Sequence, residues 1–248
     1  MILLDGKNTG KEIQTKIGEE VQKLKEQTGK TPHLIAVLVG NDGASKTYVN
    51  AKMKACERVG FRSSTLRYEE DMTEGALLAK IKELNEDPDV DGFIVQSPLP
   101  SQINPDKVVQ AIAPEKDVDG FHPINVGRMA KNLPSYISAT PYGILMLLEH
   151  YNIETSGKHC VVLGRSQIVG SPMSILMARN AKIGNCTVTL CHSRTKNLPE
   201  QTRQADILIA ALGKPNFVTA DMVKEGAIVI DVGITRVADK VESEVIAW

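Results

Sequence analysis

Three short stretches in the first half of the chain carry residue types that can act as acids, bases or hydrogen-bonding groups. Tyr48 and Lys52 are four residues apart, so they share one face if the segment is helical. Gln96 ends an apolar run before a proline-rich turn, and Asp117 and Asp119 flank one apolar residue beside a glycine. Each stretch also has a purely structural explanation. Tyr48 and Lys52 could lie on a solvated helix face, the Gln96 amide could cap a sheet, and the two aspartates could close an Asx turn.

A second candidate site lies in the segment His159–Pro172, which reads as an apolar strand, a tight loop and a helix start. Gly164 would let the backbone turn where the strand ends, and Gly170 would let the helix approach closely. The N–H groups that open a helix suit a phosphate. The spacing is not G-x-G-x-x-G, so a plain strand–helix turn without a ligand explains it equally well.

The end of the next apolar run favours NADP over NAD. Folds that prefer NAD place an acidic residue near this point, where it holds the ribose hydroxyls. This chain instead has Ser193, Arg194 and Thr195 there, and Arg165 lies in the preceding loop. Guanidinium groups suit a 2′-phosphate. The alternative is that both arginines are ordinary solvated side chains.

The elements that must position these residues alternate between strand-like and helix-like patterns. Apolar runs predict buried strands at Leu34–Val39, Gly92–Gln96, Cys160–Leu163, Thr187–Cys191, Asp206–Ala211 and Ala227–Val232. Helical patterns are found at Gly10–Gln27, Ser45–Val59, Thr73–Asn85 and Pro141–His150. The alternation predicts an α/β protein with parallel sheets and right-handed crossovers.

Loop signals concentrate between residues 114 and 141, where prolines and glycines are frequent. They predict two α/β domains, at residues 1–140 and 141–248. The second would be a Rossmann-like domain that binds the nucleotide.

Composition narrows the function further. The net charge of −1 gives no electrostatic reason to expect a nucleic acid or an anionic membrane as partner. The chain has no apolar run that could span a bilayer and no signal-peptide pattern at its start. Its 4 cysteines show no C-x-x-C spacing. They predict reduced thiols in a cytoplasmic protein without a bound metal.

Four long motifs together resemble the bifunctional methylenetetrahydrofolate dehydrogenase/methenyltetrahydrofolate cyclohydrolase family of the bacterial type. They lie at Tyr48–Phe61, Gly92–Pro100, Lys116–Gly127 and Gly164–Met173. The resemblance implies NADP-dependent oxidation of 5,10-methylenetetrahydrofolate to 5,10-methenyltetrahydrofolate, followed by hydrolysis to 10-formyltetrahydrofolate. It also implies tetrahydrofolate derivatives as partners and a homodimer.

The resemblance assigns roles in the folate domain position by position. Lys52 matches the catalytic lysine, and Tyr48 matches the tyrosine that packs against the folate and supports that lysine. Gln96 matches the glutamine that pairs with the lysine. Asp119 matches the aspartate that holds the pterin ring.

For the NADP-binding domain, the resemblance places Gly164, Arg165 and Ser166 in the pyrophosphate loop. Ser193 and Arg165 match groups associated with the 2′-phosphate. Ile234 matches a nicotinamide contact.

The end of the chain departs from the family pattern after Arg236, where relatives continue into a glycine-rich loop and a helix that returns to the first domain. We therefore expect the C-terminal return segment to be missing. Two alternatives stay open: a truncated, inactive NADP-binding protein, and another two-domain NADP dehydrogenase of the shikimate type.

Overall fold

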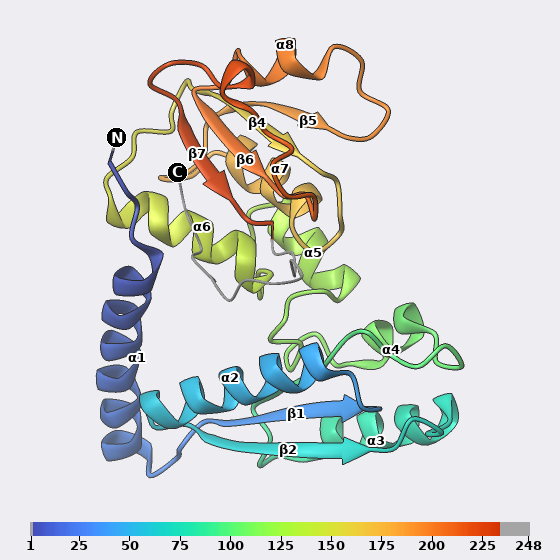
Figure 1. Cartoon of the computed structure of the whole chain (residues 1–248). Helices are drawn as coiled ribbons and strands as arrows, with labels where there is room; N and C mark the ends of the chain where they lie inside the picture. Colours follow the sequence, from blue (N-terminus) through green and yellow to red (C-terminus); the bar gives the residue numbers. More distant parts are fainter. Residues whose placement is uncertain (1, 234–248) are drawn as a thin grey trace. The chain divides into compact units, whose positions relative to one another are not determined.

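The computed structural model describes residues 2–233 of the chain. These residues form two compact units, each built on its own sheet (Figure 1). The N-terminal unit comprises Gly10–Gly127 and Ser135–Ile137, and the C-terminal unit comprises the remaining residues. The predicted boundary at residue 140, as a division between two functional domains, stays a prediction.

The N-terminal unit holds a parallel sheet in the order β2-β1-β3. The strands are β1 (His33–Val39), β2 (Arg62–Tyr68) and β3 (Gly92–Val95). Helices α2 (Gly43–Val59), α3 (Glu74–Glu86) and α4 (Pro105–Ala111) lie within this unit. Helix α1 (Gly6–Thr28) belongs to it from Gly10 onward, and α5 (Pro123–Ala130) belongs to it up to Gly127.

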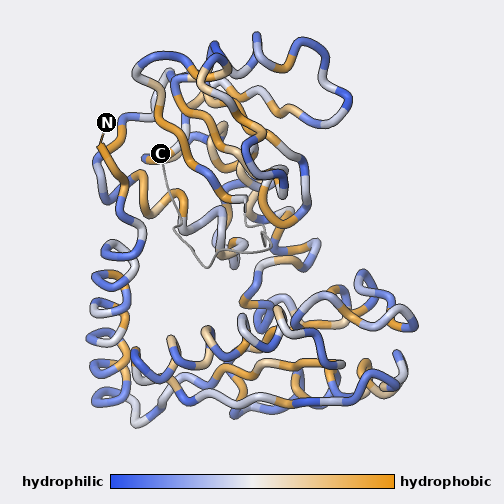
Figure 2. Tube along the Cα trace, in the orientation of Figure 1, coloured by the Kyte–Doolittle hydropathy of each residue, from blue (hydrophilic) through white to orange (hydrophobic). Residues whose placement is uncertain are grey.

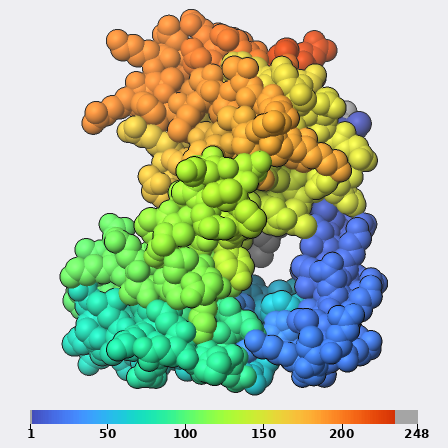
Figure 3. Space-filling model, turned by 180° about the vertical axis from the view of Figure 1, so that it is seen from behind, coloured from blue at the N-terminus to red at the C-terminus, as the bar shows by residue number. Residues whose placement is uncertain are grey.

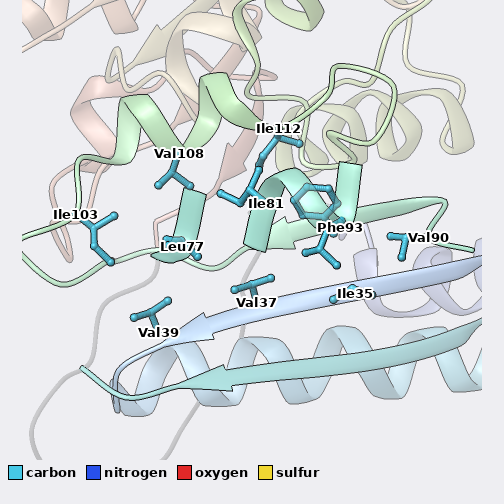
Figure 4. Packing of buried hydrophobic residues seen from close by; sticks show 11 residues of the cluster. Ile35, Val37, Val39, Leu77, Ile81, Val90, Phe93, Ile103, Val108 and Ile112 are labelled. Carbon is cyan, nitrogen blue, oxygen red and sulfur yellow. The ribbon is translucent and has the colours of Figure 1, made fainter. Parts of the chain in front are cut away.

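Alternate residues of β1 belong to two different hydrophobic clusters, because successive side chains of a strand point to opposite faces of the sheet. Ile35, Val37 and Val39 point toward α3 and α4, as Figure 4 shows. Ala36 and Leu38 pack on the other face with Val49 of α2 and Ile94 of β3. Burial on both faces explains why β1 reads as a continuous apolar run.

The C-terminal unit holds a second parallel sheet in the order β5-β4-β6-β7. Its elements are α6 (Ala139–His150), β4 (His159–Leu163), α7 (Gly170–Ala178), β5 (Thr187–Cys191), α8 (Leu198–Thr202), β6 (Ile207–Ala210), a short 3₁₀ helix (Ala220–Met222) and β7 (Ile228–Asp231). Residues of its strands are largely hydrophobic and the connecting loops are more polar (Figure 2). All four free cysteines are buried.

The predicted parallel α/β fold is confirmed, and every predicted strand is present within one or two residues of its predicted ends. Strand β2 was not predicted. Its sequence, Arg-Ser-Ser-Thr-Leu-Arg-Tyr, has no apolar run, because it is an edge strand with mostly half-buried side chains. Within residues 2–233, no helix has the length and apolar character needed to cross a membrane.

Candidate active site

Helix α2 carries the first two candidate residues of the N-terminal unit. The helix begins after Asp42, whose carboxylate accepts a hydrogen bond from Ser45 N at 2.7 Å. The spacing of four then places Tyr48 and Lys52 on one face. Residue Tyr48 is 47% exposed, and the side chain of Lys52 is 38% exposed, so both can reach a ligand.

Lys52 meets Asp119, which lies 67 residues further along the chain. Lys52 Nζ is 3.4 Å from Asp119 Oδ1. Removal from water raises the pKa of Asp119, the Lys52 ammonium opposes that rise, and the charge of Asp117 adds to it. Asp119 therefore keeps a proton at a higher pH than an ordinary aspartate.

Asp119 lies beside a small, mainly apolar cavity. Asp117, Asp119 and Phe121 line it from one loop, together with hydrophobic residues of β3 and α4. Val95 and Val108 are two of these apolar neighbours. Because they offer no hydrogen bonds, they disfavour the charged form of a carboxylate.

Gln96 follows β3 at the carboxyl end of the sheet. Its Nε2 donates to the carbonyl oxygen of Ser97 at 2.8 Å, and the buried hydroxyl of Ser45 donates to the same oxygen at 3.2 Å. Gln96 Oε1 is buried and accepts no hydrogen bond from the described residues. A buried acceptor without a donor is costly, so this oxygen is available to a ligand or an amine.

The described residues include no hydrogen bond between Gln96 and Lys52, so the implied pairing stays a prediction. Among residues 2–233, the structure also holds no cluster of three or more His, Cys, Asp or Glu side chains that could bind a metal ion.

The candidate nucleotide loop of the C-terminal unit needs glycine at two positions. Gly164 has a φ of +102°, and a Cβ there would collide with the carbonyl oxygen of Ala211. A Cβ on Gly170 would collide with the carbonyl oxygen of Gly164. The start of α7 therefore lies directly against the end of β4.

Ser166 organises this loop. Its Oγ accepts hydrogen bonds from Val169 N at 3.1 Å and Gly170 N at 3.4 Å. The first N–H groups of α7, expected to face a phosphate, are thus partly occupied. With both lone pairs engaged, the Ser166 hydroxyl can still donate its own hydrogen. Ser166 and Arg165 are exposed, so a donor and a guanidinium fit a dinucleotide phosphate at this loop.

The turn after β5 presents two exposed residues, Ser193 and Arg194. Thr195 Oγ1 accepts from His192 N at 2.8 Å, and His192 Nδ1 accepts from Arg194 N at 3.2 Å, which fixes the turn. The connection from β5 to α8 lies at the surface (Figures 1 and 3). Ile234 lies outside the described residues. The prediction that a C-terminal return segment is missing also concerns residues outside this range.

Two residues of the site were not among the predicted site residues. Ser45 shares the Ser97 carbonyl with Gln96. Asp117 is buried and accepts three hydrogen bonds. Its place in a short Asp-x-Asp-Gly stretch was the available signal, but an Asx turn explained that stretch equally well.

These features define a class: a two-unit α/β enzyme with a glycine-loop nucleotide site in one unit and a lysine–carboxylate pair in the other. The family model for the tetrahydrofolate dehydrogenase/cyclohydrolase catalytic domain matches residues 4–119. The model for the NAD(P)-binding domain of the same family matches residues 138–246. The chain therefore belongs to the tetrahydrofolate dehydrogenase/cyclohydrolase family.

Individual relatives agree with this assignment. The bifunctional protein FolD of Cytophaga hutchinsonii is 64% identical over 239 residues, which cover 96% of this chain and 82% of that protein. The bifunctional FolD structure from Campylobacter jejuni has a TM-score of 0.92 at 45% identity and covers 96% of this chain and 83% of its own.

A third relative is a FolD from Trypanosoma brucei, solved with NADP and an inhibitor. Its TM-score is 0.90 at 35% identity, and the match covers 97% of this chain and 82% of that one.

Proposed function

We propose that this chain oxidises 5,10-methylenetetrahydrofolate to 5,10-methenyltetrahydrofolate with NADP and hydrolyses the product to 10-formyltetrahydrofolate. The observation that carries the proposal is the Lys52–Asp119 pair at the carboxyl end of β3, within the segment that matches the family's catalytic domain. The shikimate-type alternative is not favoured, because both domain models belong to the folate family.

The oxidation step mainly requires that the folate be aligned with the hydride acceptor. The bridging carbon of the folate loses a hydride, and the lone pairs of its two nitrogens stabilise the resulting cation. Bound NADP supplies the hydride acceptor. The protein's contribution is to hold the folate in a reactive orientation, for which Asp119 and the exposed ring of Tyr48 are the proposed contacts.

The hydrolysis step asks for proton transfer. Water adds to the cationic carbon and loses a proton, and cleavage of one carbon–nitrogen bond requires a proton at the departing nitrogen. Lys52 is the proposed carrier. Gln96 Oε1, which is buried and has no donor among residues 2–233, is proposed to accept a hydrogen bond from the Lys52 amine and to orient it.

For the cofactor, Gly164, Arg165 and Ser166 are proposed to bind the pyrophosphate, and Ser193 with Arg165 the 2′-phosphate. Support comes from the close packing of the glycines, the exposed arginine and the turn after β5, which carries no acidic residue between positions 192 and 197. Ile234 remains a proposed nicotinamide contact.

Two spectrophotometric assays test the function. The purified chain should form NADPH from methylenetetrahydrofolate and should accelerate the loss of methenyltetrahydrofolate. If neither activity is found while calorimetry shows that NADP binds, the chain is an inactive nucleotide-binding protein. If NADP does not bind either, the cofactor assignment fails as well.

We also propose a homodimer that works in the cytoplasm. The four buried free thiols agree with a reducing compartment. Light scattering of the purified chain would give its mass in solution, and a monomer at micromolar concentration would contradict the dimer.

A further inference from the structure

Asp117 is the most deeply buried carboxylate near the site, with 2% of its surface exposed. Its Oδ2 accepts hydrogen bonds from His122 N at 2.8 Å and from Asn125 Nδ2 at 2.9 Å. Its Oδ1 accepts from Phe121 N at 3.3 Å. These three donors are neutral, so hydrogen bonds rather than an ion pair account for its burial.

These bonds close the loop that carries Asp119. Gly120 N donates to the Asp117 carbonyl oxygen at 3.1 Å, which makes residues 117–120 a turn with Asp119 inside it. Asn125, itself buried, also donates to the Pro114 carbonyl oxygen at 2.8 Å. The Asn125 amide therefore joins the Pro114 carbonyl to the Asp117 carboxylate, which closes the segment 114–125.

The loop is also fixed against the sheet. Phe93 N donates to the Lys116 carbonyl oxygen at 3.1 Å, and Phe93 forms a parallel bridge with Asp117. Gly92 lies so close to Val118 that a Cβ at position 92 would collide with its side chain. The turn therefore continues the sheet at β3, from which Gln96 also comes.

We propose that Asp117 is a positioning residue for the folate reactions: its buried carboxylate holds the turn so that Asp119 stays within reach of Lys52 and the substrate. The proposal rests on the proposed function. Asp117 contacts neither Lys52 nor, in this scheme, the folate, so its effect passes through Asp119. The charged groups that face Asp119 are Lys52 from α2 and Asp117 from the same loop.

Two variants separate the hydrogen bonds of Asp117 from its charge. Asp117→Ala removes both. Asp117→Asn removes the charge but leaves one oxygen that can accept from His122 N and Asn125 Nδ2. Asp91→Asn is the matched control, because Asp91 also accepts a backbone hydrogen bond in this unit, from His33 N at 2.9 Å, but lies at the amino end of the strands.

We expect Asp117→Ala to raise the KM for methylenetetrahydrofolate about tenfold or more, the effect of losing hydrogen bonds worth about 1.5 kcal/mol or more. The KM for NADP should stay unchanged, and Asp117→Asn should recover most of the loss. Asp91→Asn should change neither constant. A folded Asp117→Ala enzyme with the KM of the parent chain for the folate would overturn the proposal.

Titration of Asp119 by carbon NMR gives a readout that needs no activity. Without the like charge nearby, the pKa of Asp119 should fall in Asp117→Asn and stay unchanged in Asp91→Asn. If Asp117→Ala fails to fold, Asn125→Ala takes its place, because it removes one donor to the Asp117 carboxylate. A folded Asn125→Ala enzyme with the KM of the parent chain for the folate would then overturn the proposal. Failure of the proposed function can be distinguished from failure of the Asp117 proposal, because the parent chain itself would then form no NADPH.

Discussion

The two sheets are alike at the end where their strands begin. In each, an inner strand starts with a histidine, His33 in β1 and His159 in β4. The backbone N–H of each histidine donates to an aspartate carboxylate at 2.9 Å, Asp91 in one unit and Asp206 in the other.

The rest of this arrangement repeats as well. Each histidine Nε2 lies within 3.0 Å of a hydroxyl on the neighbouring edge strand, Ser64 in one unit and Thr189 in the other. Each Nδ1 lies within 3.2 Å of the carbonyl oxygen two residues before the aspartate. A lysine binds each aspartate at 2.5 Å, Lys30 to Asp91 and Lys224 to Asp206.

The opposite ends of the two sheets differ in chemistry. In the N-terminal unit the strands lead to side chains that can exchange protons, Lys52 and Asp119. In the C-terminal unit β4 leads to a loop whose glycines bring backbone close to backbone. The comparison teaches that the amino ends stabilise a shared scaffold while the carboxyl ends carry separate functions, as is general for open α/β sheets.

The largest test of this division is Lys52→Met. Loss of the amine should lower the cyclohydrolase rate by about a thousandfold, the range of a lost general acid–base group, and the dehydrogenase rate far less. Parallel assays of both activities measure the difference. Lys54→Met, an exposed lysine on the same helix, is the control. Retention of both activities would remove Lys52 from the mechanism.

The next test is Gly170→Ala in the C-terminal unit. The added methyl meets the carbonyl oxygen of Gly164, and the required backbone shift should cost about 1–3 kcal/mol. NADP binding should weaken strongly, which calorimetry would show. Gly143→Ala is the control, since nothing lies near its Cβ position in α6, and it should be neutral or stabilising by about 1 kcal/mol.

A smaller effect is expected from Arg165→Ala. Loss of a charge-assisted hydrogen bond worth about 1.5–3 kcal/mol should weaken NADP binding roughly ten- to hundredfold. NAD, which lacks the 2′-phosphate, should be affected much less. Lys158→Ala removes a charge at the opposite end of the same sheet and should change neither affinity. Equal losses for both nucleotides would argue against a 2′-phosphate contact.

Because the two sheets share the same arrangement at the amino ends of their strands, we expect substitution of either histidine to change stability by a similar amount. His33→Ala and His159→Ala should each lower the free energy of unfolding by about 1–2 kcal/mol, because each loses side-chain hydrogen bonds. Urea unfolding measures the change. Neither variant should alter the KM for folate or NADP. A large effect of one histidine on catalysis would break the division between the two ends.

The smallest effect is in the acid dependence of stability. The hydrogen bond from His159 N, followed by that from Lys224, lowers the pKa of Asp206. A lowered folded-state pKa stabilises the fold above the unfolded pKa, and this contribution is lost as the pH falls through the folded value. Asp206→Asn should therefore weaken the fold at neutral pH but flatten its loss of stability below about pH 4. Asp71→Asn, in an exposed loop, should leave that dependence unchanged.

Local patterns predicted most of the scaffold. Buried strands such as β1 and β4 were predicted because burial on both faces requires an apolar run. The edge strand β2 was not predicted, because its residues are mostly half-buried and show no clear alternation of hydrophobic and polar side chains. Lys52, Gln96 and Asp119 were predicted as separate candidates, and only the resemblance joined them into one site.

The sequence by itself determined the class of fold, the family and the ends of the strands where function lies, because periodicity and motifs are properties of neighbouring residues. Only the tertiary structure decided which distant groups meet. Lys52 reaches Asp119 across 67 residues, and a buried oxygen of Gln96 finds no donor in the described part of the chain. Such contacts, and the pKa changes that burial causes, depend on how the whole chain excludes water, which no short segment can specify.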